Sequence, residues 1–591
     1  MCGIAGIITK DGSAPDRVAL EAMMAAMRHR GPDAEGVYLK DSVGLAHTRL
    51  AIIDVEGGDQ PLTGPGGGSL VSNGEIYNFV ELRNAQGGTV AYRSDADFEP
   101  TLDPFERTGL SSLPSLRGMY VLAMHRPGTD QATGDVLLAR DPFGIKPLYV
   151  FENDALFAFA SEPQALFAAG LLTAEIDPLK RLETLQLQYS TGRDTVFRGV
   201  RRLMPGEAMR LVGGEIAEHS ELDPVPGEVP DPPADLDAAV EGFDAAFEES
   251  VRIHQRSDVP YGMFLSGGLD SAALLTMMAR LNERPVRTFT CGFDSADAHD
   301  EREAAARIAD SLGADHSETT FTEEDFWTLA PAVAAALDEP TTDYAVLPTY
   351  KLGALAKDSV KVVLSGEGGD EMFAGYGRYR KLLKPWWRGG KRPRTKGLFE
   401  GMGILREDSR DWAGGLDTVR AEAARPGFSA LQGAQATDIH AWLHADLLLK
   451  LDRCLMAHAV EGRTPFLDPG VAGFAFSLPD KLKIRDDLGK WVLRHWLARY
   501  CPAAGAFERK RGFTVQVGAW IAARGDEIGP LVARQPIIAE LCHREPVETL
   551  FRAPTGKRGR AAWSLLFYAL WHRHHIDGAR GEGDVFETLA G

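Results

Sequence analysis

The chain has 591 residues, which is too long for one ordinary domain at about 100–200 residues per domain. Hydrophobic residues make up 44% and charged residues 25% of the chain, a balance that excludes disordered and fibrous classes. The net charge of −20 argues against general binding to nucleic acid or to an anionic membrane, so we expect neither as a partner.

The first 210 residues contain short apolar runs that are broken by glycine and aspartate, together with one clear helix. Runs of this kind are typical of strands, and many strands with few helices favour an α+β sandwich. We therefore predict an α+β domain over residues 1–210. The expected helix is Val18–Met27, and the expected strands are Gly3–Thr9, Ser42–Ala51, Leu70–Val71, Met119–His125, Val136–Ala139 and Leu148–Phe151.

Residues 221–233 are rich in proline and acid and cannot hold a regular element, so we predict a linker over 211–235. Beyond it, apolar strands alternate with helical stretches, which indicates a parallel sheet covered on both faces. This α/β domain is expected over 236–525, followed by a helical C-terminal extension over 526–591. Its predicted strands are Val259–Leu265, Val286–Cys291 and Val360–Leu364, and helices are expected over Leu236–Gln255, Glu301–Leu312 and Pro348–Lys357.

The five cysteines are widely spaced and form no Cys-x-x-Cys motif. This pattern excludes a disulfide scaffold and a structural zinc knot, and it favours a reducing compartment. There is no run of 18 apolar residues and no basic, apolar N-terminal leader, so we expect neither a membrane span nor a signal peptide. A cytoplasmic location follows as an expectation.

Cys2 is a candidate nucleophile, although an isolated Met-Cys pair is more often incidental. Removal of Met1 would leave Cys2 with a free α-amino group of pKa about 7.7–8.0, which could take the thiol proton. The Asn73 amide and the Gly74 N–H could form an oxyanion hole, although Asn-Gly alone usually marks a turn. Arg49 could clamp an α-carboxylate, and Glu75 with an acid near residue 95 could receive an α-ammonium group.

With these motifs, residues 1 to about 205 resemble the class II glutamine amidotransferase domain, which has an N-terminal-nucleophile (Ntn) fold. The resemblance implies that Cys2 is the catalytic nucleophile and that Asn73 and Gly74 form the oxyanion site. It also implies a glutamine site that consists of Arg49, Ile52, Asn73, Gly74, Glu75 and Asp95. Asp95 matches the ammonium ligand in the segment Ser94–Pro100, where Asp97 is the alternative.

The motif Ser-Gly-Gly-Leu-Asp-Ser at 266–271 joins a predicted strand to a predicted helix. Gly267 and Gly268 let the backbone approach a phosphate, and the helix N-terminus favours an anion there. Asp270 would repel that phosphate unless a cation bridged them, which implies Mg²⁺. The alternative is a plain loop with a helix cap. No Gly-Lys-[Ser/Thr] occurs, so this is not a Walker loop.

A second polar loop, Ser-Gly-Glu-Gly-Gly-Asp-Glu at 365–371, also follows an apolar strand. Loops that follow parallel strands meet at one edge of the sheet, where such folds bind ligands. Asp370 would then be a second metal carboxylate beside Asp270. Glu367 could orient the acyl acceptor or transfer a proton.

The first loop resembles the pyrophosphate loop of the N-type ATP pyrophosphatases. Together with the second loop and the N-terminal domain, residues 1 to about 525 resemble the glutamine-hydrolysing asparagine synthetases. This implies ATP and Mg²⁺ as cofactors, glutamine and aspartate as substrates, and a homodimer. It also implies a catalytic Glu367, a late catalytic lysine, Lys510, and an ATP site of Leu265, Ser266, Gly267, Gly268, Asp270, Ser271, Cys291, Ser365 and Gly366.

Two alternatives stay open. A related amidotransferase could amidate a different carboxylate, because the residues that read the acceptor cannot be identified from the sequence. A non-catalytic sensor of glutamine or nucleotide could keep the same fold, although mere binding needs no nucleophile.

Overall fold

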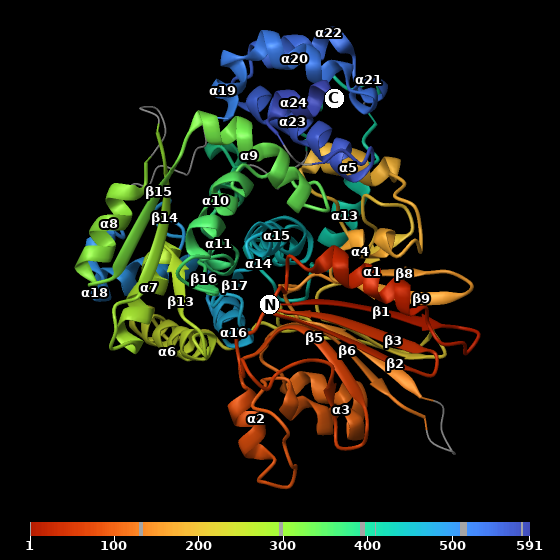
Figure 1. The fold of residues 1–591 in the computed structure, drawn as a ribbon. Coiled ribbons are helices and arrows are strands. Elements are labelled where there is room, and N and C mark those ends of the chain that lie inside the picture. The colour runs from red at the N-terminus through yellow and green to blue at the C-terminus, as the bar shows by residue number, and fades with distance from the viewer. Residues whose placement is uncertain are drawn as a thin grey trace.

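The computed structural model describes residues 2–128, 134–294, 300–390, 396–407, 409–508, 517–580 and 583–591. An N-terminal β-rich domain and a C-terminal domain with a parallel sheet and many helices lie side by side (Figure 1). The predicted two-domain fold is confirmed: an α+β sandwich is followed by an α/β parallel-sheet domain.

Two six-stranded sheets form the N-terminal domain, and all the strand pairs recorded in them are antiparallel. The first sheet has the order β10 (Val200–Arg202), β8 (Tyr149–Glu152), β9 (Leu156–Ala160), β1 (Gly3–Thr9), β3 (Val43–Arg49) and β2 (Ala34–Lys40). The second has the order β12 (Glu215–Glu221), β11 (Glu207–Val212), β7 (Asp135–Arg140), β6 (Gly118–Arg126), β5 (Ser69–Ile76) and β4 (Leu62–Thr63).

Alternating apolar residues from both sheets form the core of this sandwich. Ile4 and Leu45 from the first sheet pack in one buried cluster with Val71 and Val121 from the second. Helix α1 (Arg17–Met27) packs against β1 and β3 through Leu20 and neighbouring methionines, and the Asp16 carboxylate caps its N-terminus. The other helices of the domain are α2 (Phe79–Ala85), α3 (Leu102–Thr108), α4 (Pro163–Ala168) and α5 (Pro178–Leu187).

The C-terminal domain contains a five-stranded parallel sheet with the order β15 (Asp315–Phe321), β14 (Arg287–Phe293), β13 (Tyr261–Phe264), β16 (Val362–Leu364) and β17 (Glu461–Arg463). The chain proceeds from β13 outward in one direction and from β16 outward in the other. The strand order therefore reverses between β13 and β16, which is where open α/β sheets bind ligands.

Helices surround this sheet, as the alternating pattern predicts. The first group is α6 (Leu236–His254), α7 (Leu269–Leu281), α8 (Arg302–Ser311), α9 (Glu323–Ala336), α10 (Val346–Ala356), α11 (Gly369–Phe373) and α12 (Gly377–Leu383). The second is α13 (Ala413–Glu422), α14 (Ala430–Asp438), the π-helical η4 (Ile439–Leu447), α15 (Leu448–Met456), α16 (Pro469–Ser477), α17 (Asp480–Lys483) and α18 (Trp491–Tyr500). The last is α19 (Val517–Ala523), α20 (Gly525–Arg534), α21 (Pro536–Leu541), α22 (Arg544–Arg552), α23 (Lys557–His575) and α24 (Val585–Ala590).

Both predicted domain boundaries need correction. The predicted linker over 211–235 is too long, because residues up to Glu221 belong to the β11–β12 hairpin, which extends the second sheet. The predicted extension over 526–591 is not a separate unit either. Its helix α23 packs against α9 of the α/β domain and against α19, so an apolar face continues across residue 525.

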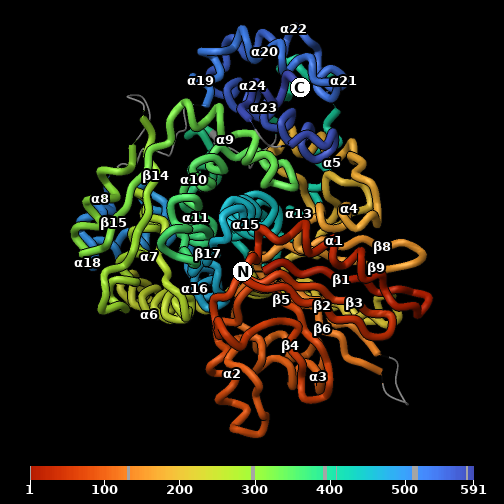
Figure 2. Tube along the Cα trace, viewed as in Figure 1, coloured from red at the N-terminus to blue at the C-terminus, as the bar shows by residue number. Residues whose placement is uncertain are grey.

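The two domains share an interface with both apolar and polar contacts, in which α15 lies close to the N-terminal end of the chain (Figure 2). All five cysteines are free thiols, as their spacing predicts. In the described part of the chain, no helix is both long enough and apolar enough to span a bilayer.

Candidate functional site

Cys2 lies directly before the central strand β1 and is buried, with 7% of its surface exposed. Its backbone N–H donates to Asn73 Oδ1 at 3.0 Å, which links the start of the chain to β5 of the other sheet. Burial raises the pKa of the Cys2 thiol, so the thiol keeps its proton until a base removes it. Met1 lies outside the described residues, and its removal stays a prediction.

Asn73 and Gly74 lie on β5 beside Cys2. Asn73 Nδ2 is buried and has no hydrogen-bond partner among the described residues, so this donor is available for an oxyanion. Gly74 has a φ of +136°, and a Cβ there would lie 1.9 Å from the carbonyl oxygen of Met119. Only glycine fits at this position, because β5 and β6 approach so closely here. The Asn-Gly pair is therefore part of a strand and does not form a turn.

The predicted ammonium ligand Asp95 lies beside the loop that binds Arg49: its N–H donates to the Asp54 carboxylate at 2.8 Å, and the Asp54 carbonyl accepts from Arg49 at 2.6 Å. The Asp95 side chain is 86% exposed and pairs with Arg83 at 2.6 Å. The alternative, Asp97, is only 8% exposed, and its Oδ2 accepts from the N–H of Ile76, directly after Glu75. Burial raises the pKa of Asp97 to about 7, and burial together with Asp97 raises the pKa of Glu75. The pair Glu75 and Asp97 therefore forms the buried acidic site.

The predicted carboxylate clamp, Arg49, is bound to a neighbouring loop in this structure. Both terminal nitrogens of Arg49 bind the 53–59 loop: Nη1 donates to the Val55 carbonyl at 3.0 Å and to Asp59 at 2.8 Å. Asp59 is mostly exposed, and the role of Arg49 as a clamp for a substrate carboxylate stays a prediction. Ile52 is buried nearby, and its carbonyl accepts from the Asp258 N–H of the α/β domain.

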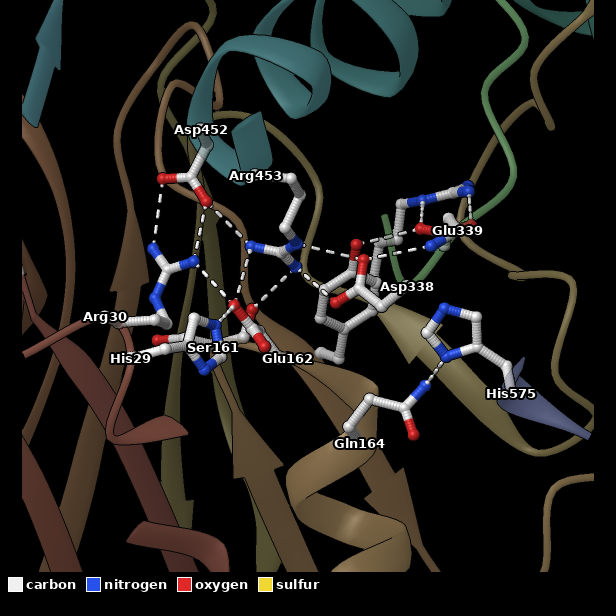
Figure 3. A network of polar contacts seen from close by, with 12 residues as sticks. His29, Arg30, Ser161, Glu162, Gln164, Asp338, Glu339, Asp452, Arg453 and His575 are labelled. Carbon is white, nitrogen blue, oxygen red and sulfur yellow. Dashed lines mark hydrogen bonds and ion pairs between the residues drawn. The ribbon is translucent and has the colours of Figure 1, made fainter. Parts of the chain in front are cut away.

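A buried network of charges, drawn in Figure 3, links Arg30 and Glu162 of the N-terminal domain to Asp452 and Arg453 of the α/β domain. The guanidinium of Arg30 donates to the Cys2 carbonyl at 3.1 Å, to Glu162 at 2.8 Å and to Asp452 on α15 at 2.8 Å. Arg453 continues the network to Asp338 at 2.6 Å. These groups come from segments far apart in sequence, so spacing alone could not reveal them.

The two polar loops of the α/β domain meet at the point where the strand order reverses, as expected. Ser266 Oγ accepts from the Gly268 N–H at 3.0 Å and lies 2.9 Å from Ser271 Oγ, which tightens the first loop. A Cβ at Gly366 would be 3.0 Å from the Asp270 Cβ, so the second loop packs directly on the first.

A cavity of about 1030 Å³ opens at this junction. All the predicted ATP-site residues line it except Gly267, which faces Ala304 on α8. The predicted residues that line it are Leu265, Ser266, Gly268, Asp270, Ser271, Cys291, Ser365 and Gly366, and Glu367 and Asp370 line it as well. Lys510 lies outside the described residues.

Lys490 joins the two predicted metal carboxylates and was missed by the sequence reasoning. Its buried ammonium group contacts Asp270 and lies 2.5 Å from Asp370. Burial by itself would lower the pKa of the Lys490 ammonium group. The attraction of the two carboxylates is larger than this effect, so the pKa is raised. No recognisable sequence motif includes this lysine, which lies directly before α18. Only its contacts in the fold identify it as part of the site.

The pair Asp270 and Asp370 is compatible with Mg²⁺. The described residues contain no cluster of three or more potential protein ligands. Mg²⁺ commonly uses one or two carboxylates, with waters and substrate phosphates as the remaining ligands, so two facing carboxylates are a suitable set.

Glu367 has a cationic partner that the sequence did not suggest. The ammonium group of the buried Lys450 lies 3.4 Å from Glu367 and 3.1 Å from Asp343. Burial would lower the pKa of Lys450, but these carboxylates raise it. The lysine thus keeps Glu367 anchored at the cavity wall.

Comparison with known proteins covers nearly the whole chain. Residues 242–573 match the family model for asparagine synthase, and residues 1–220 match that for a glutamine amidotransferase domain. A Mycobacterium tuberculosis protein named putative asparagine synthetase (glutamine-hydrolyzing) is 32% identical, with 98% of each chain covered.

Two further relatives carry similar names. Asparagine synthetase (glutamine-hydrolyzing) 1 of Bacillus subtilis is 30% identical over 98% of this chain and 97% of its own. Asparagine synthetase B of Escherichia coli is 29% identical over 88% and 83%. Among solved structures, a glutamine phosphoribosylpyrophosphate amidotransferase from B. subtilis covers 54% of this chain and 65% of its own at 16% identity, with a TM-score of 0.28, which is too low to bear on the fold.

Proposed function

Because this chain belongs to the glutamine-hydrolysing asparagine synthase family, we propose that it transfers nitrogen from glutamine to aspartate at the expense of ATP. One observation supports this most directly. A buried N-terminal cysteine bound to an asparagine amide and a carboxylate-lined cavity at the reversal of the sheet occur in one chain.

In the N-terminal domain, the α-amine of Cys2 would take the thiol proton, and the sulfur would attack the glutamine carboxamide. Asn73 Nδ2 and the Gly74 N–H would stabilise the oxyanion, while Glu75 and Asp97 would bind the α-ammonium group. The C–N bond breaks to release ammonia, and water then hydrolyses the thioester to glutamate.

In the α/β domain, the cavity between the two loops would bind ATP, with its phosphates near Ser266 and the N-terminus of α7. The β-carboxylate of aspartate attacks the α-phosphorus and pyrophosphate leaves, which gives the carboxyl group a leaving group. Ammonia then attacks the acyl carbon and AMP departs, forming asparagine.

The chain's own cations would support this step. Lys490 would hold Asp270 and Asp370 in place, and Lys450 would hold the Glu367 side chain beside the acceptor. Mg²⁺, when bound by the two aspartates and the phosphates, would screen the phosphate charge.

Product analysis tests the proposal. The purified chain should form AMP and pyrophosphate with aspartate and either glutamine or ammonium. A panel of other carboxylic acids, including glutamate and short acidic peptides, measures acceptor choice by pyrophosphate release. Formation of ADP in place of AMP, or a response to another acid with none to aspartate, would contradict the proposal.

A further inference from the structure

Arg463 lies on a strand of the parallel sheet of the α/β domain, and its side chain reaches the proposed glutamine site of the other domain. It lies on β17, is fully buried, and its Nη2 is 3.4 Å from Glu75 Oε1 of the N-terminal domain. The same guanidinium donates to Glu461 at 2.6 Å and to the carbonyl oxygens of His254 and Arg256 near the end of α6, at 2.8 and 2.6 Å.

The backbone of the same residue contacts the nucleotide loop. The Arg463 carbonyl accepts from the Ser365 N–H at 2.8 Å, and Arg463 is paired in register with Leu364 of β16. Ser365 begins the loop that carries Glu367 and Asp370. One residue therefore touches an acidic group of the glutamine site and the first residue of the second ATP loop.

Three buried carboxylates share the guanidinium of this residue. Arg463 attracts Glu75, Asp97 and Glu461, while Lys146 and the N-terminal amine also act on Glu461. An α-ammonium group that bound Glu75 would supply a further cation. It would compete with Arg463 for the same carboxylate, so the Glu75–Arg463 contact differs between the empty and the occupied glutamine site.

We propose that Arg463 is a positioning residue that couples glutamine occupancy at Glu75 to the placement of the Ser365–Asp370 loop. The inference rests on the proposed function, because it needs glutamine to bind at Glu75. Since coupling between two sites is reciprocal, occupancy of the ATP site should also change the affinity of the glutamine site.

The test compares Arg463→Met and Arg463→Lys with the full-length wild-type chain. Three quantities are measured: asparagine formed from ammonium, the KM for glutamine with and without ATP plus aspartate, and the glutamate formed per asparagine. In the wild type, we expect ATP plus aspartate to lower the glutamine KM by roughly fivefold or more.

In Arg463→Met, synthesis from ammonium should continue while the effect of ATP on glutamine KM disappears and more glutamate is formed per asparagine. Arg463→Lys keeps the charge and should restore part of the coupling. The matched control is Arg117→Met, which removes another contact between the domains, the Arg117–Asp468 ion pair at 2.9 Å, and should leave both coupling measures unchanged.

Unchanged coupling in Arg463→Met would overturn the inference. If that variant makes no asparagine from ammonium because it does not fold, Arg463→Lys decides: reduced coupling supports the inference and wild-type coupling overturns it. The inference would also be overturned if ATP plus aspartate did not change the glutamine KM of the wild-type chain. No asparagine from either nitrogen source would instead refute the proposed function, and the inference with it.

Discussion

The glutamine site and the nucleotide site hold their charged groups in opposite ways. At the glutamine site, Glu75 and Asp97 are buried close together, and burial raises the pKa values of both. Around the ATP cavity, Lys490 and Lys450 pair with the carboxylates. A cationic ligand would therefore favour the charged form of Glu75 and Asp97, whereas lysine ammonium groups already contact the carboxylates of the ATP cavity.

The substitution with the largest expected effect should stop the reaction at the glutamine site and leave the reaction at the ATP site unchanged. Cys2→Ala removes the only thiol at the glutamine site and should reduce glutamine-dependent synthesis by on the order of 10⁴-fold or more. Synthesis from ammonium should remain near wild type, because the ATP cavity is unchanged. Both rates are measured as asparagine formed; loss of both would contradict a division of labour between the domains.

Asn73→Ala should weaken the glutamine site without removing its nucleophile. Loss of one oxyanion donor typically lowers kcat by about 10²–10³-fold, so glutamine hydrolysis should fall by that amount. Glutamate release measures the effect, and synthesis from ammonium reports on the fold. A normal rate of hydrolysis would show that Asn73 Nδ2 does not face the reacting carbonyl.

Asp97→Asn and Asp95→Asn form a matched pair that tests which aspartate binds the α-ammonium group. Asp97 is buried beside Glu75, so losing its charge should lower kcat/KM for glutamine by roughly 30-fold or more. Asp95 is exposed and should change it less than about twofold. The reverse order of effects would restore Asp95 as the ligand.

The smallest expected effect is on stability. Burial raises the pKa of Asp97 to about 7 from 3.8, so between these pH values the folded chain binds a proton that the unfolded chain has lost. The Asp97 contribution to the free energy of unfolding therefore falls as pH rises from about 4 to 7. Asp97→Asn should lose less stability across this range in denaturant titrations; an identical pH dependence in both proteins would contradict the raised pKa.

Local sequence patterns predicted most of the elements that carry the sites. The apolar runs at β1 and β16 and the helix at α1 were found because hydrophobic periodicity reports which face of an element is buried. The polar strand β15 was missed, since it has few apolar side chains and is paired on one side only, by β14. The β12 strand was taken for part of the linker for a similar reason: it is exposed and at an edge.

The sequence by itself determined which motifs are present: the cysteine after Met1, the Asn-Gly pair and the two glycine-rich loops. The tertiary structure decided their partners. It buried Asp97 and left Asp95 exposed, brought Lys490 between two aspartates, and placed Arg463 of one domain beside Glu75 of the other. The physical reason is that backbone conformation is encoded locally, whereas burial and charge pairing depend on which distant segments the fold brings together.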